Sequence, residues 1–141
     1  GGIITKLNTH PLKGDVGDVA VFKLIVRLLR EGKKVILFPE GQRSFDDIMT
    51  PIKPGISLLA FKADAAIIPA YIFGTFEAWP RKRRFPKIGK KIGCVFGSPL
   101  IWENVHHLDR KEAQVVFASQ IKEAIEGLKK WYEAGAHGVP P

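Results

Sequence analysis

The order of apolar segments predicts an α/β domain with a central mixed or mostly parallel sheet of about four or more strands, flanked by helices. Short runs of β-branched residues alternate with longer segments in which apolar residues recur at helical spacing. Glycine and proline stand at the boundaries between these segments. A length of 141 residues suits one core, so we expect a single domain over residues 1–134 and a flexible tail over residues 135–141.

The first half of the chain predicts two strands joined by a helix. Residues 3–7 are rich in β-branched side chains and are expected to form a strand. The helix should follow the polar loop of residues 13–18, present one apolar face and stop at Gly32. Residues 34–38 are then expected to form a buried second strand, which is parallel to the first if the helix is the crossover.

The middle of the chain predicts a short helix and a third strand. Pro54 suits the first turn of a helix, where a backbone N–H would have no partner, and apolar residues continue this helix to about Ala63. Residues 66–73 are expected to form the third strand. Pro69 removes one ladder hydrogen bond, so this strand should be edge-like or bulged at that point.

The last part of the chain predicts a fourth strand and a long helix. Residues 92–96 supply the strand, and Cys94 within it is expected to be a small core residue rather than a nucleophile. Asp109 is placed to cap the helix. The apolar residues of this helix lie on one stripe: Phe117, Ile121, Ala124, Leu128 and Trp131.

Composition narrows the classes of function. The net charge of +8 favours anionic partners, which are phosphorylated metabolites, anionic lipid surfaces or nucleic acid. No stretch is long and apolar enough for a transmembrane span, and no signal peptide is visible. The chain has no Gly-x-x-x-x-Gly-Lys pattern of a nucleotide P-loop. His106 and His107 are neighbours without a completing ligand set, so no metal site is expected.

The segment richest in chemistry is residues 38–44, at the predicted end of a buried strand. Strand ends in α/β sheets are where such proteins place binding groups. Gly41 would let a ligand approach the main chain, and Arg43 could bind a phosphate through two hydrogen bonds. Glu40 could accept a hydrogen bond from a hydroxyl. Glu40 and Arg43 could equally form an ion pair that only tightens the turn.

This segment, Phe-Pro-Glu-Gly-Gln-Arg-Ser, resembles the FPEGTRS block of the glycerolipid acyltransferases, the 1-acylglycerol-3-phosphate acyltransferase family. Only Gln42 departs from the block. Residues 53–56 resemble the KxG helix start that follows in the family, and residues 66–70 resemble its IIPV strand. The resemblance covers roughly residues 2–100 and implies an acyltransferase-like fold.

The resemblance also implies an activity. An acyl group would pass from acyl-CoA or acyl carrier protein, acting as co-substrate, to the free hydroxyl of a lysophospholipid, and no cofactor is expected. The glycerol phosphate of the acceptor would contact the turn and two residues outside it. These residues are Phe38, Pro39, Glu40, Gly41, Arg43 and Ser44, with Lys13 and Pro69.

In the family, the histidine of an N-H-x-x-x-x-D block acts as general base and the aspartate orients it. His10 and Asp15 have this spacing and are the candidates that the sequence offers. Pro11 follows His10, however, which suits a turn rather than the start of a helix, and the distance to Glu40 is too short. We therefore expect His10 to be a loop histidine and the catalytic block to precede Gly1 in a longer enzyme.

A basic loop, residues 81–91, follows the third strand and has three interpretations. Its cations could be a solvated charge run, a contact with an anionic membrane surface, or a nucleic-acid site. No RNA- or DNA-binding signature accompanies it, so no nucleic-acid partner is expected. The candidate membrane contacts are Trp79, Arg81, Lys82, Arg83 and Arg84.

These observations predict a peripheral protein at the cytoplasmic face of a membrane. The leading interpretation is a lysophospholipid acyltransferase domain. The alternative is a non-catalytic module that holds anionic lipid or phosphate through the same turn and the basic loop. The sequence does not determine the oligomeric state.

Overall fold

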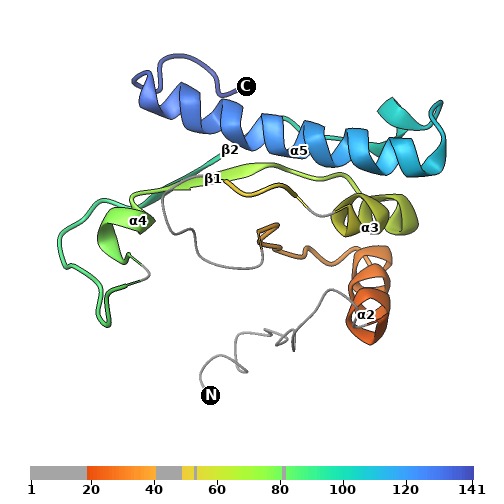
Figure 1. Cartoon of the computed structure of the whole chain (residues 1–141), viewed down its shortest axis with the longest axis horizontal. Helices are drawn as coiled ribbons and strands as arrows, with labels where there is room; N and C mark the ends of the chain where they lie inside the picture. The colour runs from red at the N-terminus through yellow and green to blue at the C-terminus, as the bar shows by residue number, and fades with distance from the viewer. Residues whose placement is uncertain (1–18, 41–48, 53, 81) are drawn as a thin grey trace.

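The computed structural model describes residues 19–40, 49–52, 54–80 and 82–141. The elements in chain order are α2 (Val19–Arg30), α3 (Gly55–Ala63), β1 (Ala70–Phe73), α4 (Thr75–Ala78), β2 (Gly93–Phe96), the 3-10 helix η1 (Trp102–Val105) and α5 (Arg110–Glu133). Helix α5 runs along one side of the two strands, and α2 lies on the other side (Figure 1). The strand predicted at residues 3–7 lies outside the described residues.

The mixture of helices and strands is confirmed, but the large parallel sheet is not. In the described part of the chain the sheet has two strands, and β1 pairs with β2 in antiparallel orientation from Ala70–Phe96 to Phe73–Gly93. The connection between them holds the one-turn helix α4. Residues 74–92 thus return the chain beside β1 without a long crossover helix among the described residues, as an antiparallel pair allows.

The prediction of a buried strand at residues 34–38 is wrong. The described segment forms neither helix nor strand, and Ile36 and Phe38 are 85% and 70% exposed. A strand requires a hydrogen-bonding neighbour, and the described sheet consists of β1 and β2 alone. Apolar content predicted burial here, but tertiary pairing decides whether such a run becomes a strand.

The prediction that Cys94 belongs to the core is also wrong, because its side chain is exposed. Cys94 pairs with Ile72, and cross-strand partners lie on the same face of a sheet. The opposite face carries Phe73, whose ring stacks on Tyr132 of α5 with centroids 4.0 Å apart. Helix α5 therefore covers one face of the sheet, and Cys94 points away from it.

The helix predicted before Gly32 is confirmed as α2. Gly32 has a φ of 75°, which is accessible to glycine without strain, and the N–H of Lys33 donates to the carbonyl of Leu28 at 2.9 Å. These features form a Schellman stop. The guanidinium of Arg30 donates to the carbonyl of Lys62 at 2.7 Å, which fastens the end of α2 to α3.

The core lies where α5 packs against α3 and η1. Phe117 of α5 is fully buried and makes an edge contact with Trp102 of η1, with centroids 5.4 Å apart. Trp102 also lies 5.1 Å from Phe61 of α3. The predicted cap of α5 is confirmed, because the Asp109 carboxylate accepts from the backbone N–H of Lys111 at 3.0 Å. Aromatic contacts thus join three elements around one side chain.

Ser57 gives a test of this core. Its hydroxyl is fully buried and has no hydrogen-bond partner among the described residues. An unsatisfied buried hydroxyl is costly, so Ser57→Ala should raise the free energy of unfolding by about 1 kcal/mol, measured by urea denaturation. The matched control is Ala60→Ser, which adds a hydroxyl to a buried position of the same helix and should lower stability. A less stable Ser57→Ala protein would show that the hydroxyl has a partner.

Candidate functional site

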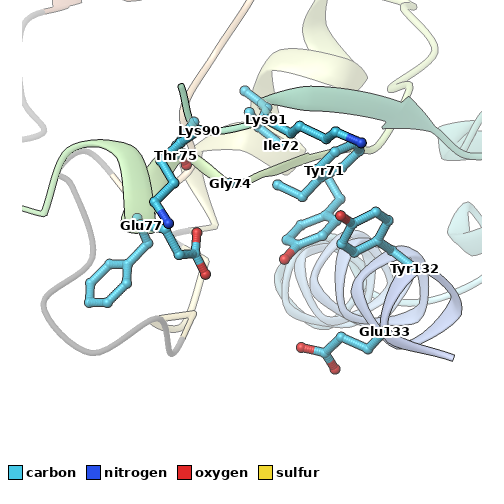
Figure 2. Close-up of a pocket in the computed structure, with 11 residues that line it drawn as sticks. Tyr71, Ile72, Gly74, Thr75, Glu77, Lys90, Lys91, Tyr132 and Glu133 are labelled. Atoms are coloured by element: carbon cyan, nitrogen blue, oxygen red, sulfur yellow. The ribbon is translucent and has the colours of Figure 1, made fainter. Parts of the chain in front are cut away.

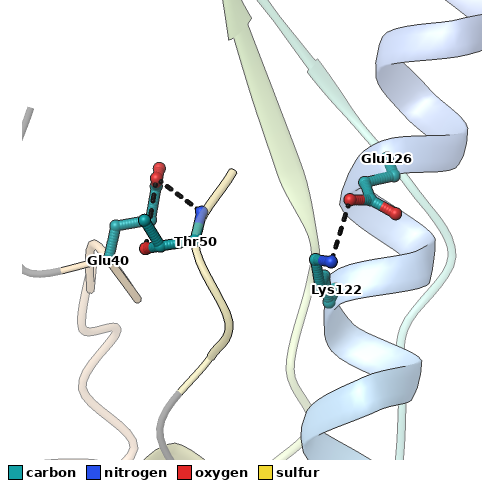
Figure 3. A network of polar contacts seen from close by, with 4 residues as sticks. All are labelled: Glu40, Thr50, Lys122 and Glu126. Carbon is teal, nitrogen blue, oxygen red and sulfur yellow. Dashed lines mark hydrogen bonds and ion pairs between the residues drawn. The ribbon is translucent and has the colours of Figure 1, made fainter. Parts of the chain in front are cut away.

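Glu40 belongs to the predicted phosphate-binding turn, and its side chain forms hydrogen bonds with Thr50. One oxygen of its carboxylate, Oε2, accepts hydrogen bonds from the backbone N–H of Thr50 at 3.2 Å and from the Thr50 hydroxyl at 3.5 Å (Figure 3). The two residues are ten positions apart. The Glu40 carboxylate therefore joins the two ends of the segment that contains Arg43 and Ser44.

The sequence did not reveal this contact of Glu40. Sequence reasoning considered a ligand hydroxyl and Arg43 as its partners, whereas the observed partner is Thr50. A hydrogen bond between a charged carboxylate and a backbone N–H is stronger than one between neutral groups. No local spacing rule links residues ten positions apart, so no sequence signal could have identified Thr50.

The other described residues of the proposed acceptor site lie in different surroundings. Phe38 is exposed, and Pro39 is half-buried beside Glu40 in the chain. Pro69 is buried, and its carbonyl accepts from the N–H of Gly97 at 2.9 Å, at the end of β2. Pro69 and Glu40 thus have hydrogen-bond partners in different parts of the chain, Gly97 and Thr50. The structure supports a packing role for Pro69 at the sheet.

Several predicted site residues lie outside the described part of the chain, and their roles stay predictions. They are His10, Lys13, Asp15, Gly41, Arg43, Ser44 and Arg81. Among the residues that are described, no group of three metal-binding side chains comes together.

A surface pocket of about 310 Å³ lies apart from the residues that the sequence singled out for binding (Figure 2). It is lined by the end of β1, by α4 and by the end of α5, with Lys90 and Lys91 on one side. Glu77 and Glu133 also line it. Because ammonium and carboxylate groups share the lining, the pocket has no strong preference for an anion.

The basic loop is exposed, as predicted. Its backbone is held at three points: Lys87 N–H donates to the Ala78 carbonyl at 2.7 Å, Arg83 N–H donates to the Pro80 carbonyl at 2.9 Å, and the indole N–H of Trp79 donates to the Arg83 carbonyl at 2.9 Å. Every described residue from 82 to 92 is exposed. The candidate membrane contacts Lys82, Arg83 and Arg84 are therefore accessible to a partner, and Trp79 is 46% exposed.

Comparison of the sequence with known proteins identifies a family. The model of the acyltransferase family matches residues 4–73, a range that includes the turn, Thr50 and Pro69. A 1-acyl-sn-glycerol-3-phosphate acyltransferase of Bacillus subtilis is 27% identical over 129 residues, which cover 92% of this chain and 61% of that protein. The chain belongs to the acyltransferase family.

Plant relatives match shorter regions. A chloroplastic 1-acyl-sn-glycerol-3-phosphate acyltransferase of Arabidopsis thaliana is 32% identical over 82 residues, covering 57% of this chain and 23% of that protein. A 1-acyl-sn-glycerol-3-phosphate acyltransferase of Limnanthes alba is 41% identical over 64 residues, covering 45% of this chain and 22% of that protein. The chain thus spans less than two thirds of the length of these relatives. The search of solved structures finds no significant match.

The hydropathy of the helices is a separate finding. Within residues 19–40, 49–52, 54–80 and 82–141, none of the helices has both the length and the apolar character that crossing a bilayer requires.

The Glu40–Thr50 contact predicts a change in backbone protection. Glu40→Ala removes the acceptor of the Thr50 N–H, so hydrogen exchange at that amide should become about fivefold faster, the equivalent of about 1 kcal/mol. Exchange measured by NMR at single-residue resolution would show it. Glu31→Ala is the control, because Glu31 is an exposed carboxylate whose ion pair with Arg27 lies within α2. An unchanged exchange rate of the Thr50 amide in Glu40→Ala would show that the Glu40 carboxylate does not protect this N–H.

Proposed function

We propose that the protein transfers an acyl group from acyl-CoA or acyl carrier protein to the free hydroxyl of 1-acylglycerol-3-phosphate, a step of phospholipid biosynthesis. The observation that carries the proposal is the family match over residues 4–73, which contains the Phe-Pro-Glu-Gly-Gln-Arg-Ser turn. The names of the relatives support the acceptor, since those proteins are called 1-acyl-sn-glycerol-3-phosphate acyltransferases.

The proposed site binds the phosphate of the acceptor through residues 38–44. The guanidinium of Arg43 would donate two hydrogen bonds to phosphate oxygens, and Gly41 would let the phosphate approach backbone N–H groups. Ser44 would donate through its hydroxyl, and Lys13 would add a positive charge. Glu40 would support this arrangement indirectly, because its carboxylate is engaged with Thr50 on the far side of the segment in sequence. Binding energy at the phosphate orients the distant hydroxyl for reaction.

The hydroxyl also needs a general base, since an alcohol attacks a thioester only as its proton is removed. His10 and Asp15 have the family spacing, but Pro11 disfavours the helix start that the block requires. We therefore do not assign the base to His10. An acyl-transfer assay compares residues 1–141 with the same chain extended by any coding sequence that precedes Gly1. Activity of residues 1–141 alone would support His10 as the base, whereas activity of the extended chain alone would place the base upstream.

We further propose that the protein acts at the cytoplasmic face of a membrane as a peripheral protein. The proposal rests on the acceptor, because a lysophospholipid resides in or at a bilayer.

A second candidate function is a non-catalytic module that binds anionic lipid or phosphate. The exposed cations of residues 82–91 favour it, since they would serve such a module without any chemistry. Absence of acyl transfer by both the printed and the extended chain would support this second function.

Arg43 gives the kinetic test of the acceptor site. Arg43→Ala should raise the KM for 1-acylglycerol-3-phosphate by about 10- to 100-fold, because a charge-assisted pair of hydrogen bonds is lost. The KM for acyl-CoA should change less than about twofold, since Arg43 is assigned to the acceptor and not to the acyl donor. Steady-state assays with each substrate varied in turn would measure both constants in the chain that shows activity.

The matched control for this test is Arg27→Ala, which removes an exposed arginine whose observed partner is Glu31 in α2. It should leave both constants unchanged. Equal rises in the two KM values of Arg43→Ala would contradict the assignment of Arg43 to the acceptor.

A further inference from the structure

Residues 82–92 form a surface in which cations and bare apolar side chains alternate, and we call it the docking loop. Its cations are Lys82, Arg83, Arg84, Lys87, Lys90 and Lys91, and its apolar side chains are Phe85, Ile88 and Ile92. The loop contains no aspartate or glutamate. It projects at one end of the molecule, beyond α4 (Figure 1).

The apolar side chains of the docking loop contribute little to the fold. Phe85 is 67% exposed, Ile88 is 102% exposed and Ile92 is 58% exposed. Single exposed apolar residues are ordinary on protein surfaces, but three within one short cationic loop are a patch. Such a patch gains free energy when a partner removes it from water.

The backbone of the docking loop is held in a defined path, so its side chains are presented together. The hydrogen bonds of Lys87 to Ala78 and of Arg83 to Pro80 tie its first half to the end of α4. Gly89, with a φ of 84°, turns the chain directly after Ile88. Holding the loop in advance reduces the ordering cost of binding.

We propose that the docking loop binds an anionic membrane surface. The side chains of Phe85 and Ile88 enter the headgroup region, and the surrounding lysines and arginines contact lipid phosphates. Charge complementarity selects this partner, because the loop offers six cations and no carboxylate. The inference deepens the proposed function and rests on it in one respect, namely that the acceptor lipid lies in the same membrane.

The side chains favour a lipid surface over nucleic acid. Bases stack on open aromatic faces, whereas the guanidinium of Arg84 lies 5.5 Å from the centroid of the Phe85 ring and occupies one face. Ile88 and Ile92 have no π face to offer a base. The indole N–H of Trp79 is engaged with the Arg83 carbonyl, so it is not available to a base edge. Exposed aliphatic and aromatic side chains among cations suit the boundary between the headgroups and the acyl chains of a bilayer.

Vesicle binding by the printed chain tests the proposal. The charge variant combines Lys82→Gln, Arg84→Gln and Lys87→Gln, and should weaken binding to vesicles of phosphatidylcholine and phosphatidylglycerol in equal parts by about 100-fold at low salt. Its control combines Lys23→Gln, Lys33→Gln and Lys34→Gln, which remove the same charge from exposed positions in and after α2. This control should weaken binding much less.

The apolar variant tests insertion. Phe85→Ser with Ile88→Ser should weaken vesicle binding by about tenfold and remove the part of the binding that survives high salt. Its control is Val115→Ser with Val139→Ser, which changes two other exposed apolar residues and should leave binding unchanged. Far-ultraviolet circular dichroism would verify that all four proteins are folded.

Three results would overturn the proposal. Equal losses of vesicle affinity in the charge variant and its control would show that net charge, and not the docking loop, determines binding. Full binding by the apolar variant would exclude insertion, and tighter binding to single-stranded RNA than to vesicles would reassign the loop.

Calorimetry with a short-chain lysophosphatidate below its micelle concentration separates this proposal from the acceptor site. Loop variants should keep that binding, whereas Arg43→Ala should lose it, so either proposal can fail alone.

Discussion

Burial of the apolar face of α5 is the constraint on which the described structure depends. Phe117 and Leu128 of this helix are fully buried; the Trp102 ring of η1 contacts Phe117, and the Phe61 ring of α3 contacts Trp102. At the other end of α5, Tyr132 stacks on Phe73 of β1. One helix therefore fixes both the end of the molecule that holds α3 and the sheet from which the docking loop projects (Figure 1). Loss of this packing would separate the two regions, since two strands alone are not stable.

The proposed site is organised by a second, local constraint. The Glu40 carboxylate accepts two hydrogen bonds from Thr50, and these two residues flank in sequence the segment that carries Arg43 and Ser44. Acidic and basic residues of one motif thus have different proposed tasks: the acid positions the turn, and the arginine binds the acceptor phosphate. The docking loop would bring the same molecule to the lipid surface where that acceptor resides. Positioning, acceptor binding and membrane contact are in this way assigned to separate residues.

The sequence predicted what depends on local chemistry and missed what depends on tertiary pairing. The stop of α2 at Gly32, the short helix α3, the cap of α5 at Asp109 and the exposed basic loop follow from turn, cap and charge rules. Ile36 and Cys94 were predicted to be buried and are exposed, because burial depends on which strand or helix lies opposite. The sequence identified the family block but not Thr50, because no spacing rule relates residues that lie ten positions apart.

We propose above that residues 38–44, supported by the Glu40–Thr50 contact, bind the acceptor phosphate. An NMR titration of the ¹⁵N-labelled chain with sn-glycerol 3-phosphate tests it most directly, because each backbone amide reports on its own surroundings. We expect the largest shift changes between residues 38 and 50, with smaller changes elsewhere. Shift changes confined to the pocket beside Tyr132, or to the docking loop, would contradict it.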